Sequence, residues 1–183
     1  SFTAVSGVDQ RRARATMRDD LDVLEENAQG LTGSLRITAA GPWTLAASTL
    51  LPRGGHVVGD AVARRDLAQS LAVGVGELRE EIERRLPAIT VTLQVDEPAL
   101  PAVLEGGIRT ESGYARYAAI EKEEVVGALS GLQGDVLHCC APGLDPSVAS
   151  PLHHGILVMG ELGIPQIQAN INHGVSSGGT GLR

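Results

Sequence analysis

Two long segments of the chain carry apolar residues along one side of a helix. In residues 9–29 the apolar positions recur every three or four residues, and Gly30 follows as a stop signal. A second segment of this kind begins after Asp60, a good N-cap residue, and ends before Pro87. We expect both segments to be amphipathic helices. Their apolar positions are Ala13, Met17, Leu21, Leu24 and Ala28 in the first segment, and Leu67, Leu71, Val75, Leu78 and Ile82 in the second.

Three short runs rich in aliphatic residues predict strands between these helices. They cover residues 35–39, 89–95 and 135–140, and a proline follows each run within three residues. In the middle run, the residues that would point to one face and those that would point to the other are both fairly apolar, so we expect this strand to be covered on both faces. Further helices are expected over residues 45–51 and 121–132. The order of elements is typical of parallel βα units and predicts an α/β fold.

The last 41 residues differ in composition from the rest of the chain. They contain two short strand candidates, residues 156–159 and 164–171, and a glycine-rich end. We therefore divide the chain into a domain over residues 1–142 and an atypical tail over residues 143–183. The only charged residues of the tail are Asp145, Glu161 and Arg183.

Composition and charge exclude several classes of function. A chain of 183 residues with 43% apolar and 2% aromatic residues fits one aliphatic core. A formal net charge of -7 works against the phosphate neutralisation that nucleic-acid binding needs. No apolar run approaches the roughly 18 to 20 residues that span a bilayer, and no secretory signal opens the chain. We expect a cytoplasmic protein that binds neither nucleic acid nor membranes.

The polar residues best suited to chemistry follow the three predicted strands. In a parallel α/β sheet or barrel, ligands bind beyond the carboxyl ends of the strands. We therefore expect a functional site where these ends meet. The three strand ends carry Gly41, Pro42 and Trp43, then Asp96, Glu97 and Pro98, and finally His138, Cys139 and Cys140.

His138 and Cys140 are candidate metal ligands. Side chains alternate along a strand, so these two point the same way and Cys139 points oppositely. An imidazole and a thiolate suit zinc. The alternative is a small buried cysteine pair beside a satisfied histidine. Weaker candidate ligands in the tail are His153, His154 and His173.

Asp96 and Glu97 are candidate substrate-binding residues. Their carboxylates can bind a cation such as an amino group, or act as acid and base. The alternative is a helix start, where carboxylates favour the positive end of the helix dipole and Pro98 fits the first turn. Trp43 is more simply explained as a packing residue.

Residues 93–100 (LQVDEPAL) and 136–140 (VLHCC) together resemble the catalytic barrel of cobalamin-independent methionine synthases, closest to the short single-barrel relatives. Residues 37–45 (ITAAGPWTL) resemble the Gly-Pro-x-Thr strand end of that family, and the likeness runs from about residue 9 to residue 142. The resemblance implies a TIM-barrel fold of (β/α) units.

The same resemblance implies a site and a reaction. Asp96 matches the aspartate that binds the amino group of homocysteine, and His138 and Cys140 match two of the zinc ligands. The implied reaction transfers a methyl group from a methyltetrahydrofolate to the thiolate of homocysteine, which zinc keeps deprotonated. The catalytic acid for the folate is not assigned.

Departures from the family predict an incomplete barrel. The family's other zinc ligands are a glutamate and a second cysteine, yet no cysteine follows Cys140. The first strands are expected before Ser1, and a complete barrel typically needs about 250 residues. Unpaired sheet edges would promote self-association. Two alternatives stay open: another zinc-dependent thiol methyltransferase of the same barrel type, or a non-catalytic remnant that acts only through association.

Overall fold

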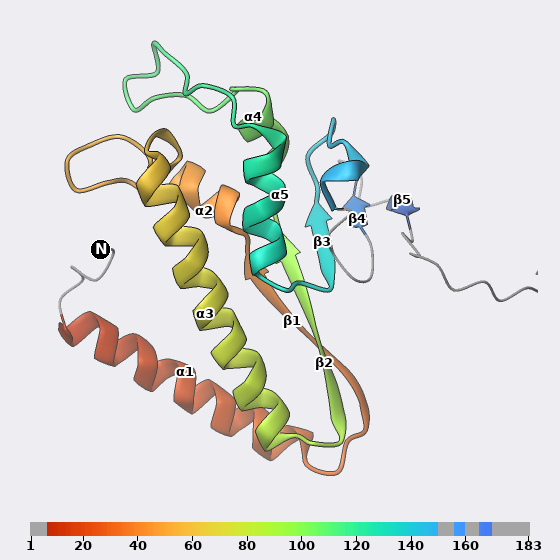
Figure 1. Cartoon of the computed structure of the whole chain (residues 1–183). Coiled ribbons are helices and arrows are strands. Elements are labelled where there is room, and N and C mark those ends of the chain that lie inside the picture. The colour runs from red at the N-terminus through yellow and green to blue at the C-terminus, as the bar shows by residue number, and fades with distance from the viewer. Residues whose placement is uncertain (1–6, 150–155, 160–164, 170–183) are drawn as a thin grey trace, which may run out of the picture.

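The computed structural model describes residues 7–149, 156–159 and 165–169. A sheet forms the centre of the fold, with its strands in the order β1-β2-β3-β4-β5 (Figure 1). The first four strands are parallel, and β5 is antiparallel to β4. The strands are β1 (Gly33–Ala40), β2 (Ile89–Asp96), β3 (Val136–Cys139), β4 (Ile156–Met159) and β5 (Pro165–Ala169).

In the described part of the chain, five helices and two short 3-10 turns connect or precede the strands. Three longer helices lie along the same face of the sheet, and the two short ones follow the carboxyl ends of β1 and β2 (Figure 1). The predicted α/β class and the order of helices and strands are confirmed. The helices are α1 (Gly7–Ala28), α2 (Pro42–Ser48), α3 (Ala61–Arg85), α4 (Leu100–Leu104) and α5 (Lys122–Gly131), and the 3-10 turns are η2 (Val57–Gly59) and η3 (Pro146–Ala149).

Local sequence explains where several of these helices begin and end. Asp60 accepts hydrogen bonds from the backbone N–H groups of Val62 and Ala63, so it caps α3 as predicted. Proline at the first turn starts α2 at Pro42, three residues earlier than the sequence pattern predicts. The short helix α4 has no counterpart among the sequence predictions.

The sheet has one buried face and one open, more polar face, and successive side chains of a strand point to them alternately. On β2, Val91, Leu93 and Val95 are buried beneath the helices, whereas Thr92 and Gln94 on the other face are only partly buried. The prediction that this strand is covered on both faces is therefore wrong for the described residues. Threonine explains the error, because its methyl group makes a half-exposed face look apolar.

The main core lies between the sheet and helices α2, α3 and α5. Leu93, Leu129 and Leu137 are its central aliphatic residues, each 1% exposed or less. Val148 of η3 belongs to the same core, so core packing continues past the predicted domain boundary at residue 142. As expected, aliphatic residues rather than aromatic ones make up nearly all of it.

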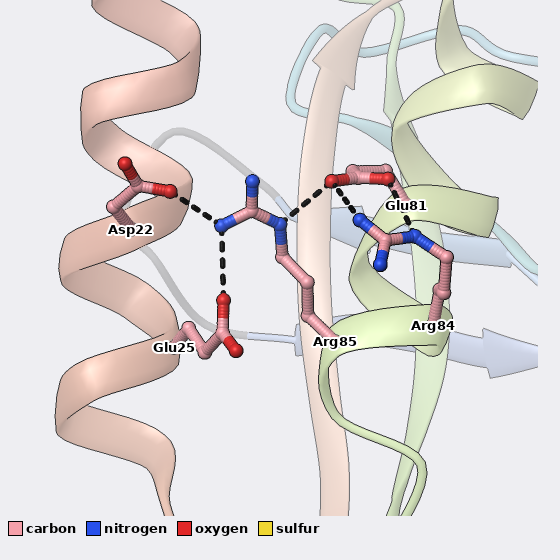
Figure 2. A network of polar contacts seen from close by, with 5 residues as sticks. All are labelled: Asp22, Glu25, Glu81, Arg84 and Arg85. Atoms are coloured by element: carbon pink, nitrogen blue, oxygen red, sulfur yellow. Dashed lines mark hydrogen bonds and ion pairs between the residues drawn. The ribbon is translucent and has the colours of Figure 1, made fainter.

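Helix α1 packs only through its second half. Leu21 is 9% exposed and Ala28 7%, while Met17 on the same apolar stripe is 48% exposed. An ion-pair network ties this second half to the end of α3 (Figure 2). There the Arg85 guanidinium lies between the carboxylates of Asp22 and Glu25, at 2.6 and 3.0 Å.

The described strands do not close into a barrel. The barrel type stays a prediction, because β1, β2 and β3 form a small parallel sheet that is not closed. Strand β5 pairs antiparallel with β4, a pairing that an all-parallel barrel does not contain. No helix in the described part of the chain is long and apolar enough to cross a membrane.

Candidate functional site

The carboxyl ends of β2 and β3 bring together two of the predicted site residues. Asp96 and His138 are direct partners in the register of these parallel strands. Asp96 Oδ1 lies 2.8 Å from His138 Nδ1, and the two side chains are 32% and 24% exposed. Both belong to the open face of the sheet. The structure therefore places these two predicted site residues in contact, and their role in a functional site stays a prediction.

The hydrogen bond to Asp96 fixes the orientation of the His138 ring. A carboxylate oxygen accepts hydrogen bonds, so Nδ1 of a neutral His138 carries the proton and donates a hydrogen bond to Asp96 Oδ1. Nε2 then keeps its lone pair, the form in which imidazole binds a metal or accepts a proton. The Asp96–His138 pair therefore has the arrangement of a metal-binding histidine with an orienting carboxylate.

Two residues that are not among the predicted site residues, Gln94 and Arg36, extend this pair into a row of hydrogen bonds. Gln94 Nε2 donates a 2.8 Å hydrogen bond to the same Asp96 Oδ1, and Arg36 Nη1 donates to Gln94 Oε1 at 3.3 Å. This row of hydrogen-bonded side chains runs from β1 across β2 to β3 on the open face. Period-two alternation counted back from Asp96 would have selected Gln94, and the same alternation on β1 includes Arg36.

The two adjacent cysteines have different surroundings. Neither forms a disulfide, Cys139 is completely buried and Cys140 is exposed. Burial raises the pKa of the Cys139 thiol. Along β3 the side chains of Leu137 and Cys139 are buried while His138 is not, which agrees with the predicted alternation. Cys140, which follows β3, is thus the more accessible of the two thiols.

Glu97 has a structural environment. Its side chain is fully buried, and Oε1 accepts a 2.9 Å hydrogen bond from the backbone N–H of Trp43. Oε2 accepts hydrogen bonds from the N–H and the hydroxyl of Thr44, at 2.7 and 2.6 Å. These N–H groups belong to the first turn of α2, whose own N-cap residue, Gly41, has no side chain to cap it.

The local environment of Glu97 also changes its titration. Burial raises the pKa of Glu97 to about 7, although the hydrogen bonds from Thr44 and Trp43 act in the opposite direction. The sequence pattern offered capping of the following helix as the alternative, whereas the carboxylate caps α2, the helix after the preceding strand. A substrate-binding role for Glu97 stays a prediction.

Trp43 packs in the core, as expected. It is 3% exposed, and its Nε1 donates a 3.3 Å hydrogen bond to the Val125 carbonyl of α5. The residue thus joins the first turn of α2 to the helix layer. Trp43 therefore lies on the side of the helices and takes no part in the row of polar side chains on the open face.

A complete metal site is not assembled by the described residues. No group of three or more His, Cys, Asp or Glu side chains within residues 7–149 is placed to hold one metal ion. His138 and Cys140 stay the predicted ligands. The weaker candidates His153, His154 and His173, and the acidic tail residue Glu161, lie outside the described residues. Zinc binding therefore stays a prediction.

The cavity between α3 and α5 is separate from this site. Its volume is about 620 Å³, and it lies in the helix layer, on the opposite side of the sheet from His138. Trp43 is the only residue of a predicted strand end that it contains. Small side chains dominate the lining, among them Ala68, Ala72, Gly127, Ala128 and Gly131.

Comparisons with protein families, curated proteins and solved structures give no match for this chain. The resemblance to cobalamin-independent methionine synthases therefore stays a prediction from the sequence motifs.

Proposed function

We propose that this chain is part of a zinc-dependent methyltransferase of the βα-barrel type. The proposed reaction transfers a methyl group from a methyltetrahydrofolate to the thiol of homocysteine, giving methionine. One observation supports this proposal most directly, the 2.8 Å contact between Asp96 and His138 at the ends of adjacent parallel strands. The two motifs that carry the sequence resemblance are thus in contact.

In the proposed site, His138 and Cys140 hold the zinc. The imidazole fits this role because Asp96 occupies Nδ1 and leaves Nε2 available. The thiol fits because Cys140 is exposed at the end of β3. Zinc, when bound, would keep the substrate thiol deprotonated at neutral pH. The second oxygen of Asp96 is left for the amino group of the substrate.

The open face of the sheet supports the barrel type. In a (β/α) barrel the helices lie outside and the other face of every strand lines the interior. Helices α1, α3 and α5 lie on one face here (Figure 1). The side chains of Gln94 and Asp96 alternate along β2 with the buried residues beneath these helices, so they belong to the other face. We propose that this open face is the interior surface of a barrel that the described strands only begin.

A non-catalytic role through association is the second candidate. It is favoured by the first half of α1, whose apolar stripe is left uncovered at Met17. An exposed apolar stripe of this kind is typical of a helix that packs against a partner. This role predicts an oligomer that binds no zinc. Measurement of the zinc content of the chain therefore separates it from the methyltransferase.

Zinc stoichiometry of the reduced, zinc-supplemented chain tests the proposed function. We expect close to one zinc per chain, and loss of that zinc in His138→Ala and in Cys140→Ala. Cys139→Ala is the matched control, because Cys139 is buried on the opposite face and should not change the stoichiometry. A parent chain that binds no zinc, or a loss confined to Cys139→Ala, would contradict the proposal.

A further inference from the structure

Arg36 is a positively charged residue of the open face that forms no ion pair with any of the described residues. It is exposed on β1, and within residues 7–149 its only polar contact is the Gln94 amide oxygen at 3.3 Å. Most other interactions of arginine with the fold use carboxylates, as Arg85 does with Asp22 and Glu25. A guanidinium that is held by a neutral amide keeps its charge available for an anion.

The side chain of Arg36 leans toward Asp96. In the strand register Arg36 lies opposite Thr92, yet its guanidinium reaches Gln94, which is two residues nearer the carboxyl end of β2. Gln94 in turn donates to Asp96 Oδ1. A cationic group and a carboxylate are therefore joined on one face by a single side-chain amide.

Small side chains leave room beside this chain of contacts. The residues of β1 that follow Arg36 on the same face are Thr38 and Ala40, which lie opposite Gln94 and Asp96 in the register. Ala40 is exposed and carries only a methyl group. A small ligand can thus lie along the open face between the guanidinium and the Asp96 carboxylate.

The spacing of these charges selects a class of ligand. An α-amino acid carries an ammonium group and a carboxylate that are one carbon atom farther apart than the nitrogen and oxygen of an amide. The Gln94 amide already spans the distance from Arg36 to Asp96 with one hydrogen bond at each end. A zwitterionic amino acid lying alongside Gln94 can place its ammonium group on Asp96 and its carboxylate near the guanidinium.

We propose that Arg36 binds the carboxylate of an α-amino acid substrate and, with Asp96, makes the open face specific for a zwitterion. This inference rests on the proposed function for the identity of the substrate, homocysteine. Arg36 is then a specificity-determining residue that distinguishes amino acids from simple amines and thiols. Guanidinium suits the task because it matches a carboxylate with two parallel donors.

Calorimetric titration of the full chain tests this proposal with ligands that separate the charges. The ligands are homocysteine, its thiol-free analogue 2-aminobutyrate, and propylamine, which lacks the carboxylate. In Arg36→Gln we expect the affinity for both amino acids to fall by about tenfold or more, the usual effect of losing a charge-assisted contact. Propylamine binding should not change, and Arg36→Lys should restore part of the affinity.

Arg12→Gln is the matched control, because it removes an exposed arginine from α1 in the helix layer. Equal amino-acid binding by the parent and Arg36→Gln would overturn the role of Arg36 and leave the zinc proposal intact. Arg36-dependent binding of 2-aminobutyrate by a chain that binds no zinc would support Arg36 and contradict the methyltransferase. A parent that binds neither amino acid would overturn the inference about Arg36 as well.

Discussion

Gly41 lies directly against the carboxylate of Glu97, so that a side chain of even one carbon at position 41 would overlap it. The backbone φ of Gly41 is -76°, a value open to any residue, so close approach rather than backbone conformation requires glycine here. The Gly41 N–H also donates a 2.8 Å hydrogen bond to the Asp96 carbonyl. This contact brings the start of α2 to the end of β2.

Gly41→Ala should therefore destabilise the fold. The added methyl group must displace the buried Glu97 carboxylate from the first turn of α2, and overpacking of this kind costs about 1 to 3 kcal/mol. Urea unfolding followed by circular dichroism measures the change. Gly74→Ala in α3 is the control, since no atom lies near its added methyl group and alanine favours a helix by up to about 1 kcal/mol. Equal stability of Gly41→Ala and the parent would contradict the observed contact.

Glu97 should make stability fall as the pH rises. Its pKa is raised from 4.5 to about 7 in the folded chain, so the folded state holds a proton that the unfolded state has released between these values. The stabilisation that comes from the protonated Glu97 is fully present below pH 4.5 and is lost as the pH rises from 4.5 through 7. The free energy of unfolding changes by roughly 3 kcal/mol over this range. The free energy of unfolding, measured by urea titration at several pH values, should show this slope.

Glu97→Gln provides the control for this titration. The amide cannot ionise, so the stability difference between the parent and Glu97→Gln should shrink as the pH rises from 5 to 7. The low pKa of Glu81, about 2, affects stability only in more acidic solution and leaves this window clear. A stability difference that is constant across the window would mean that Glu97 is ionised throughout.

Much of the fold could be predicted because it follows from local patterns. The three- and four-residue spacing in α3, with its Asp60 cap, is sufficient to place that helix. The rule that parallel strands gather ligands at their carboxyl ends was sufficient to bring Asp96 to His138. These inferences need only the period of the pattern and the direction of the strands.

The remaining contacts depend on packing between distant segments. Nothing in the sequence around Glu97 indicates that its carboxylate turns inward to Thr44, because the donor groups of Thr44 and the accepting carboxylate lie more than fifty residues apart in the sequence. The same holds for Asp135, which accepts a hydrogen bond from the Leu93 N–H and pairs with Arg79 at 3.2 Å. Such contacts follow from the relative placement of helices and sheet, which sequence periodicity does not specify.

Arg85 should hold the second half of α1 against α3. It links Asp22 and Glu25 of α1 to Glu81 of α3 through one guanidinium (Figure 2). We expect Arg85→Gln to speed hydrogen exchange of the α1 amides several-fold, with little change in the central strands, because local opening needs only these contacts to break. Amide exchange followed by mass spectrometry measures both regions.

Arg84→Gln is the matched control for this prediction. Arg84 pairs with Glu81 within α3 and has no ion pair to α1 among the described residues. Its removal should leave exchange in α1 unchanged. If both variants speed exchange in α1 equally, the stability of α3 itself rather than the bridge controls the attachment of α1.

The neutral form of the His138 ring should carry its proton on Nδ1, because Asp96 Oδ1 accepts a hydrogen bond there at 2.8 Å. Nitrogen chemical shifts of the imidazole measure this tautomer directly in the metal-free chain. In Asp96→Ala the shifts should move toward the ordinary mixture, in which Nε2 is more often protonated. Gln94→Ala tests the specificity of the effect, because Gln94 donates to the same oxygen and does not touch His138. It should leave the tautomer in place, and a predominantly Nε2-protonated ring in the parent would contradict the role of Asp96 in preparing His138 to bind a metal.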